Sequence, residues 1–567
     1  MQFLGRTCGA LGQLAGTVSR IQQTRMAFSS SRLVRTKQEA IKHGLVVGIT
    51  GTQKQQQQQQ LYGADATGLT AAQQQQIVRQ VQALGGKAKA GSVQLVFLED
   101  ASDAGQHKHV AVVGLGDGAA DTAYTGEIVR MAVANGVRQL CSGGGKITDV
   151  TVGPMPCQQA SAEGARLALY KFDVFKARKG DKGEVKAEKG AGVAVTHLAQ
   201  QGAADASSKW DAGAVYAAAQ NYARDLMNTP ANHMTPTMFA DRVRAEMAGL
   251  AGVQVNVYDK AWAEAQRMGG LLAVARGSDE PLRFVEIVYR GGAGDGEVPL
   301  ALVGKGITFD TGGYSLKPSK YMDLMKGDMG GGATVAAAMR AIAQLRLPIN
   351  VVATVPLCEN MVSGCATKVS DVYTSRAGLT VEVMNTDAEG RIVLADALHY
   401  TIETHRPRAI VDVATLTGAM VVALGELYTG VFTPSPLLWD AISKASAATH
   451  EPVWRMPLHD QWDAMLKSPV ADLSNIGSKA EAGACTAAAF LRQFVGATAE
   501  RQSPLPDGSG VLRDQNNDES IPRWAHLDIA GPMEASASSG YHQKGLSGRP
   551  TRMLIELARL MAKNPLP

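Results

Sequence analysis

The sequence has 567 residues, of which 45% are hydrophobic and 19% charged, so it is long enough for several hydrophobic cores and has an ordinary globular composition. It contains no run of about 18 uncharged apolar residues, so we expect no transmembrane helix and no membrane partner. The formal charge of +4 comes from residues 1–38, which carry six basic and no acidic residues; the rest has a net charge of −2 and gives no indication of nucleic-acid binding.

Residues 1–38 have the composition of a mitochondrial transit peptide, with spaced arginines, three consecutive serines and no acidic residue. A disordered tail is the alternative. We therefore expect the protein in the mitochondrial matrix, with the cytoplasm as the alternative location. The scattered cysteines, without a C-x-x-C pair, fit a reducing compartment and argue against a disulfide scaffold or a structural zinc site. They are Cys8, Cys141, Cys157, Cys358, Cys365 and Cys485.

Residues 39–208 are expected to form a small N-terminal α/β domain. Folded structure should begin at the apolar run 45–49, and further strands are predicted at 93–98 and 110–113. Helical spacing predicts helices at 125–140 and 163–169. Low-complexity segments, expected in loops or helix flanks, are the glutamine runs 55–60 and 73–76 and the Lys/Glu-rich stretch 176–189.

An alanine-rich linker helix is predicted over residues 209–228, because Pro230 prevents its continuation. The larger domain that follows, 229–567, alternates strands and helices. Its predicted strands are 284–289, 300–303, 350–356, 379–383 and 409–413, and its predicted helices are 333–344 and 394–403. This alternation indicates a largely parallel sheet covered on both faces. Residues 497–523 are polar and have the composition of a surface insertion.

Acidic residues occupy three turns of this larger domain. Asp310 follows the strand at 300–303, Asp328 precedes a helix, and Asp387 and Glu389 lie on a strand-to-helix turn. An isolated Asp-x-Glu is usually only a helix cap. Carboxylates from several turns at one end of a sheet repel one another unless cations hold them, and oxygen ligands suit zinc, manganese or magnesium. Two such ions form a known hydrolytic device.

Three stretches resemble the metal motifs of the leucine aminopeptidase family: VGKGITFDTGGYSLK at 303–317, MKGDMGGGA at 325–333 and NTDAEGR at 385–391. Supporting similarity occurs at 228–236, 413–420, 482–491, 524–531 and 545–557. The resemblance covers about 225–567 densely and the N-terminal part only loosely, around 162–176. It implies an α/β protein with a smaller N-terminal α/β domain, followed by a catalytic domain whose mixed, largely parallel sheet is covered by helices.

The resemblance also implies two divalent metal ions per subunit, zinc or manganese, with magnesium or cobalt as alternatives. The tight site would use Lys305, Asp310, Asp328 and Glu389, and the exchangeable site Asp310, Asp387 and Glu389. Lys305 must then be neutral, because an ammonium group has no lone pair, and two adjacent cations would lower its pKa.

Further roles are implied for residues near the metals. Lys317 would stay charged and face the oxyanion of the reaction, and Arg391 would hold a bicarbonate ion acting as general base. A surface arginine is the alternative for Arg391, and a core methionine for Met325. The residues implied around the first side chain of the substrate are Met325, Thr415, Leu416 and Gly418.

The expected function is a metalloaminopeptidase that releases N-terminal amino acids, preferably leucine and other apolar residues, from peptides with a free N-terminus. The family resemblance implies a homohexamer. A two-metal phosphoesterase remains an alternative, because acidic clusters serve both reactions. A structural or DNA-binding role is a second alternative, which the near-neutral body of the chain disfavours.

Overall fold

The computed structural model describes residues 43–50, 59–83, 88–99, 107–116, 125–142, 147–176, 193–198, 204–292, 296–496 and 522–566. The expected transit peptide, most of the first glutamine run, the Lys/Glu-rich stretch beyond residue 176 and most of the 497–523 insertion lie outside these residues. None of the helices in the described part of the chain is long and apolar enough to span a bilayer.

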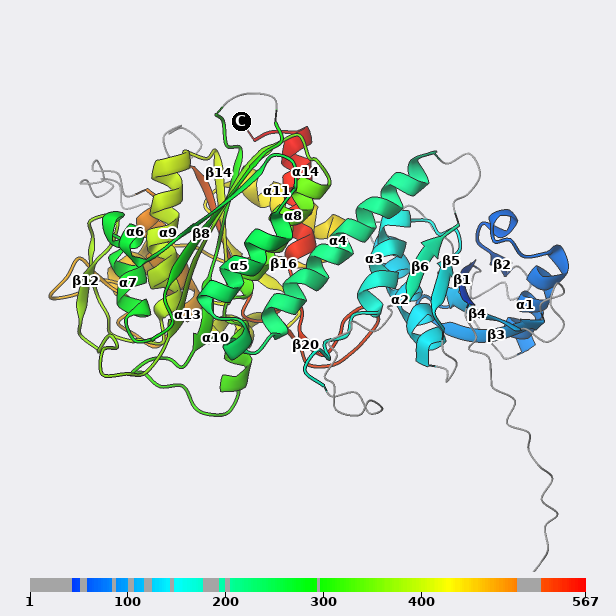
Figure 1. Cartoon of the computed structure of the whole chain (residues 1–567), viewed down its shortest axis with the longest axis horizontal. Helices are drawn as coiled ribbons and strands as arrows, with labels where there is room; N and C mark the ends of the chain where they lie inside the picture. The colour runs from blue at the N-terminus through cyan, green and yellow to red at the C-terminus, as the bar shows by residue number, and fades with distance from the viewer. Residues whose placement is uncertain are drawn as a thin grey trace, which may run out of the picture. The chain divides into compact units, whose positions relative to one another are not determined.

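The N-terminal domain is a twisted sheet with helices on both faces (Figure 1). Its strands run in the order β3 (Val93–Glu99), β4 (His107–Gly114), β1 (His43–Thr50), β5 (Asp149–Val152) and β6 (Ala194–His197), with β2 (Gln60–Leu61) paired to β1. Successive residues of β1 point to opposite faces. Val47 packs toward α1 (Ala71–Ala83), and Val46 packs toward α2 (Thr125–Ser142) and α3 (Gln158–Ala168). The predicted strands and helices are confirmed, except that α3 begins before residue 163 and the second glutamine run lies within α1.

Helix α4 (Ala204–Asn228) connects this domain to the larger one and packs against α3 and α8 (Gly330–Gln344). It ends at Asn228, two residues before Pro230, as the sequence predicts. Its first turn lies outside the predicted range, because the helix begins at Ala204 rather than at residue 209.

The larger domain contains a mixed, mostly parallel sheet, which confirms the predicted fold class. The central strands β18, β14, β9 and β11 are parallel, whereas β8 and β7 add antiparallel strands at one edge. Beyond β18, β15 is antiparallel and carries β16. The strands are β7 (Val253–Tyr258), β8 (Arg283–Arg290), β9 (Leu300–Gly304), β10 (Gly306–Asp310), β11 (Asn350–Asn360), β14 (Ala409–Ala414), β15 (Thr429–Phe432), β16 (Val453–Arg455) and β18 (Arg523–Asp528).

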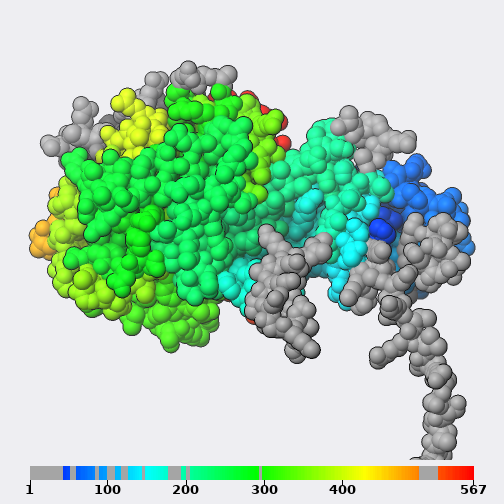
Figure 2. Space-filling model, in the orientation of Figure 1, coloured from blue at the N-terminus to red at the C-terminus, as the bar shows by residue number. Residues whose placement is uncertain are grey.

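Both faces of this sheet are covered by helices, and β9 shows why. Leu300 and Leu302 pack into a core shared with α4, α8, α5 (Pro236–Met247), α11 (Pro436–Thr449) and α14 (Thr551–Lys563). Ala301 and Val303 pack into a second core with α7 (Gly269–Ala275), α9 (Glu389–His405) and α13 (Gly483–Val495). A continuously apolar strand is expected where both faces are buried. Figure 1 shows these two helix layers on either side of the strands. Figure 2, drawn in the same orientation, shows that green segments, which include α5, form most of the surface of this domain that faces the viewer.

The predicted strand at 379–383 is part of a different sheet. It forms β13 (Thr380–Glu382), which pairs with β12 (Val372–Thr374) and β17 (Leu473–Ser474) in a separate small sheet. Its sequence explains the difference, because the apolar Val381 and Val383 alternate with the polar Thr380 and Glu382, and Thr380 is bonded to the exposed Asp472. Alternation of apolar and polar residues indicates a sheet with only one covered face, whereas both faces of the main sheet are covered.

Candidate metal centre

Lys305 and Thr415 lie side by side at the carboxyl ends of two parallel strands. Lys305 follows β9 and Thr415 follows β14, and the Lys305 N–H donates to the carbonyl of Val413 over 3.0 Å. The buried side chain of Lys305 then donates from Nζ to the Thr415 carbonyl, also over 3.0 Å. The main sheet therefore fixes this lysine at the edge where α/β proteins bind ligands.

Asp310 ends the neighbouring strand β10 and is held by donors on one of its oxygens. Oδ1 accepts hydrogen bonds of 2.8 Å from the Gly312 N–H and from Nδ2 of Asn360, the last residue of β11. Oδ2 faces Nζ of Lys317 at 2.8 Å. The carboxylate is thus locked in one orientation with Oδ2 directed toward the cluster.

Asp328 lies between the short 3-10 helix η4 (Met322–Gly327) and α8. Its Oδ1 accepts from the Thr415 hydroxyl over 2.7 Å and lies 2.9 Å from Nζ of Lys305. The nearby Gly331 in α8 has to be glycine, because a Cβ there would lie 1.9 Å from the Val413 carbonyl oxygen. The first turn of α8 can approach the strand ends only for that reason.

Asp387 and Glu389 enter the cluster from the N-terminus of α9. Oε1 of Glu389 lies 2.8 Å from Nζ of Lys305, and Oδ1 of Asp387 lies 2.5 Å from Nζ of Lys317. Gly390 allows this approach, because a Cβ there would lie 2.7 Å from Nζ of Lys305. The helix begins at Glu389, five residues before its predicted start, so both Glu389 and Arg391 belong to its first turn.

The carboxylates are close enough to perturb one another. One oxygen from each of Asp310, Asp387 and Glu389 can be chosen so that all three lie within 4.8 Å of one another. Burial, reinforced by the negative charges of neighbouring carboxylates, raises the pKa of Asp310 and Asp387 and raises the pKa of Asp328 well above its ordinary value. Positive charge is needed to keep this cluster ionised.

The two lysines supply only part of that charge. Burial lowers the pKa of Lys305, but Asp328, Glu389 and Asp310 outweigh this effect and raise it overall; the pKa of Lys317 is raised in the same way, with Asp310 the strongest partner. Four carboxylates facing two ammonium groups leave an excess of two negative charges.

The donor set fits divalent cations. The buried oxygens Asp328 Oδ2 and Glu389 Oε2 have no hydrogen-bond partner among the described residues, and such atoms are costly unless something binds them. Carboxylate oxygens from Asp310 and Asp387 converge on the same place. The Lys305 amine lies against the same group of residues and can join a metal shell only when neutral, which nearby cations favour.

Arg391 is buried in the first turn of α9, with only 7% of its surface exposed. Its Nη1 donates to the Asn475 carbonyl over 3.1 Å, whereas Nε has no hydrogen-bond partner among the described residues. Burial lowers its pKa to about 10, against the opposing effect of Glu389 and Asp528. A buried guanidinium at a helix N-terminus is a suitable environment for an anion.

The predicted substrate-binding residues lie next to this centre. Thr415 contacts both Lys305 and Asp328, and Met325 is half-buried in η4, three residues before Asp328. Leu416 is half-buried and Gly418 is exposed; a Cβ on Gly418 would meet no atom within 4 Å. The chain therefore leaves open space beside Gly418.

Several residues that support the centre were not identified from the sequence. Asn360 bridges the first and third motifs, since its Nδ2 also donates to the Thr386 carbonyl over 3.0 Å. Asp528 accepts from the Leu416 N–H and the Thr417 hydroxyl, and Asn475 holds the third motif. The end of β11 at Asn360, a polar residue closing a buried strand, is the one signal that the sequence offered.

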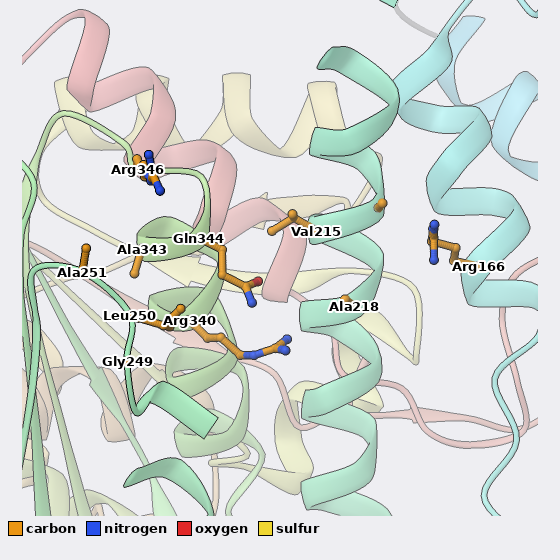
Figure 3. A pocket seen from close by; sticks show the side chains of 11 residues that line it. Arg166, Val215, Ala218, Gly249, Leu250, Ala251, Arg340, Ala343, Gln344 and Arg346 are labelled. Atoms are coloured by element: carbon orange, nitrogen blue, oxygen red, sulfur yellow. The ribbon is translucent and has the colours of Figure 1, made fainter. Parts of the chain in front are cut away.

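A surface pocket of about 520 Å³ lies elsewhere and contains none of these residues. It is lined by residues of α3, α4 and α8 and of the turns after α5 and α8, including Arg166, Arg340 and Arg346 (Figure 3). In Figure 3 the labelled arginines come from different elements. Arg340 is paired with Glu246 at 2.7 Å.

Comparison with known proteins identifies two matching family models. The cytosol aminopeptidase family, catalytic domain, matches residues 221–555, and the cytosol aminopeptidase family, N-terminal domain, matches residues 46–179.

Individual relatives agree with these models. The cytosol aminopeptidase of Xenopus tropicalis is 41% identical over 537 residues, covering 93% of this chain and 94% of the relative. The cytosol aminopeptidase of Homo sapiens is 45% identical over 455 residues, covering 79% of this chain and 80% of the relative. Among solved structures, the bottromycin maturation enzyme BotP in complex with Mn superposes with a TM-score of 0.72 at 32% identity, covering 92% of this chain and 100% of that chain.

Proposed function

The chain belongs to the cytosol aminopeptidase family, and on that basis we infer that it is a metal-dependent aminopeptidase that removes residues from the N-termini of peptides. Identity above 40% over most of the chain supports the activity. The observation that carries the mechanism is the group of four carboxylates and two lysines at the carboxyl edge of the main sheet, in which Asp387 and Lys317 are partly exposed and the other four are buried.

Lys305, Asp310, Asp328, Asp387 and Glu389 would hold the metal. When bound, divalent ions supply Lewis-acid chemistry, polarising a carbonyl oxygen and acidifying water. With Lys305 neutral, the four carboxylates and the charged Lys317 carry a net charge of −3, which two divalent ions per subunit would bring to +1. Manganese or zinc suits this mixed oxygen and nitrogen donor set.

Lys317 is proposed to stabilise the negative charge that develops on the substrate carbonyl oxygen. It is 21% exposed, so it is partly accessible from the solvent side while its Nζ lies among the carboxylates. Although burial opposes it, the neighbouring carboxylates raise the pKa of Lys317 and so favour its charged form in the metal-free protein. A fixed cation in a partly desolvated place is worth much more in the transition state than in water.

Arg391 is proposed to bind bicarbonate, which would accept a proton from the attacking water. Support comes from the Arg391 Nε, which is buried and has no hydrogen-bond partner in the part of the chain that the structure describes, and from the helix N-terminus around it. A general base of this kind contributes about 10²–10⁴-fold in rate.

Substrate selection is proposed to follow from the same geometry. A free, unprotonated α-amine can ligate one of the metal ions, whereas the nitrogen of an acetylated N-terminus is an amide and a poor ligand, so blocked peptides should be excluded. The open space beside Gly418, close to Leu416 in the chain, is proposed to receive the first side chain, with leucine and other apolar residues preferred. Met325, on η4, is proposed to line the same space.

We propose that the active protein is a homohexamer. Exposed apolar side chains on α10 (Gly418–Leu424), in the turn after it and on β16 support association, because Val422 is 90%, Leu427 56% and Trp454 58% exposed. Exposed apolar surface of this kind marks contact sites. The mitochondrial matrix, with the cytoplasm as alternative, remains our proposal for the location.

The test compares three substrates on the purified, manganese-loaded protein: leucyl-anilide, its N-acetylated form and a phosphomonoester. We expect release of aniline from the free leucyl compound alone. Hydrolysis of the phosphomonoester without leucyl-anilide turnover would overturn the assignment in favour of a phosphoesterase.

A further inference from the structure

Asn475 is a fully buried residue that follows β17 in the small sheet, far in the sequence from the metal motifs. Its side chain fastens the main chain of the third motif by two pairs of contacts. Oδ1 accepts from the N–H groups of Met384 (2.8 Å) and Asn385 (3.2 Å), and Nδ2 donates to the carbonyls of Asn385 (2.6 Å) and Ala388 (3.5 Å). One amide therefore holds both ends of the loop that presents Asp387.

The main chain of the same residue holds Arg391. The Asn475 carbonyl accepts from Nη1 of Arg391 over 3.1 Å, and this is the one hydrogen bond of that guanidinium to protein that the described residues provide. Asn475 also anchors itself, because its own N–H donates to the Glu382 carbonyl of β13 over 3.0 Å. The residue thus links a fixed strand, the Asp387 loop and the Arg391 side chain.

We propose that Asn475 is a positioning residue that sets the Arg391 guanidinium and the Asp387 loop relative to each other; this rests on the proposed function. The amide of Asn475 supplies an acceptor and a donor on one rigid plane, which the paired N–H and carbonyl groups of the loop require. A displacement of about 1 Å in a catalytic constellation can cost about 10²-fold in rate.

If Asn475 only stabilised the fold, replacing it would have the same effects as replacing another residue that fastens this segment. Asp472 is such a residue. Asp472 lies three residues earlier in the same segment, and its Oδ2 accepts from the Thr380 N–H (2.8 Å) and hydroxyl (2.7 Å). It fastens the segment to β13, as Asn475 does, but within the described residues its hydrogen bonds go to Thr380 and not to the motif loop or Arg391. Asp472→Ala is therefore the matched control.

The experiment uses the full-length protein carrying Asn475→Ala, Asn475→Asp or Asp472→Ala. Wild-type leucyl-anilide turnover is measured first, so that failure of the proposed function is recognised separately. Each variant is then compared for kcat, KM, melting temperature without metal, and manganese retention in competition with a chelator. Asn475→Asp is nearly isosteric and keeps the acceptor, so it guards against loss of folding in the alanine variant.

We expect both Asn475 variants to lose about 10–100-fold in kcat, with KM changed less than about threefold, and to release one manganese equivalent at about 10–100-fold lower chelator. Asp472→Ala should match wild type in kcat and in manganese retention. The proposal is overturned if wild type is active and the Asn475 variants keep wild-type kcat. It is equally overturned if their losses of kcat and metal only parallel a fall in melting temperature that Asp472→Ala shares.

Discussion

The hydroxyl of Thr415 donates a 2.7 Å hydrogen bond to Oδ1 of Asp328, joining the end of β14 to the start of α8. Because Lys305 also donates to the Thr415 carbonyl, one residue orients two members of the proposed metal shell. Partners of this kind fix the direction in which a ligand presents its lone pairs.

Replacing Thr415 by valine removes the hydroxyl and keeps the β-branched shape. Asp328 loses its fixed orientation, so we expect manganese affinity to fall about 10–100-fold, measured by chelator competition. Thr433→Val is the control, since Thr433 is also buried at the end of a main-sheet strand and donates to a carbonyl, that of Trp524, over 2.6 Å. Equal affinity in both variants would contradict the role given to Thr415.

Replacing Lys317 by alanine should leave the metal bound and remove most of the turnover. The lysine is expected to act on charge that develops only in the transition state, so kcat should fall about 10²–10³-fold with little change in metal content. Lys320→Ala is the control, because Lys320 is exposed three residues further on and lies over the Tyr321 ring. Wild-type turnover in Lys317→Ala would remove this residue from the mechanism.

Gly418→Val should change selectivity without unfolding the protein. A side chain there enters open space, and the position has no left-handed backbone. The ratio of kcat/KM for leucyl over alanyl substrates should fall about tenfold or more. Gly364→Val, at an exposed glycine with equally open surroundings, should leave the ratio unchanged. An unaltered ratio in the Gly418 variant would place the first side chain elsewhere.

Much of the main sheet and of the metal centre can be predicted from contiguous stretches of sequence. The strand ending at Gly304 is a continuous apolar run, and the strand ending at Ala414 is apolar apart from Asp412. Lys305 directly follows the first of these strands, Asp310 ends β10, and Asp328 lies two residues before α8. The polar residues that support the metal centre cannot be predicted in this way. Asn475 binds main-chain atoms about 90 positions away, and Asp528 binds the loop after β14 about 112 positions away, so no local pattern points to either.

The start of α9 was misplaced for a related reason. Glu389, Gly390 and Arg391 carry no apolar period, so the helix becomes recognisable in the sequence only from Leu394. The first turn is held in place by the buried contact between Glu389 and Lys305. Because this is a tertiary contact, the local sequence pattern does not indicate it.

Glu286 should give a measurable pH dependence of stability away from the metal centre. Although burial opposes it, hydrogen bonds from His405, Asn256 and Tyr400 lower its pKa from 4.5 to about 2. Its contribution is therefore fully present above about pH 4.5 and is lost as the pH falls toward 2.

Glu286→Gln should accordingly lower the melting temperature at pH 7, and the difference from wild type should shrink toward pH 3. The lowering of the Glu286 pKa corresponds to a contribution of about 3 kcal/mol to the free energy of unfolding at neutral pH. A difference that stays constant between pH 7 and pH 3 would show that lost packing, not ionisation, explains the effect.

The most direct test of the central claim is leucine release from a peptide before and after exhaustive chelation, followed by stepwise return of manganese or zinc. We predict loss of activity on chelation and its recovery after about two equivalents of metal per subunit, as expected for a dinuclear hydrolytic site. Undiminished leucine release from the metal-free protein would contradict the account.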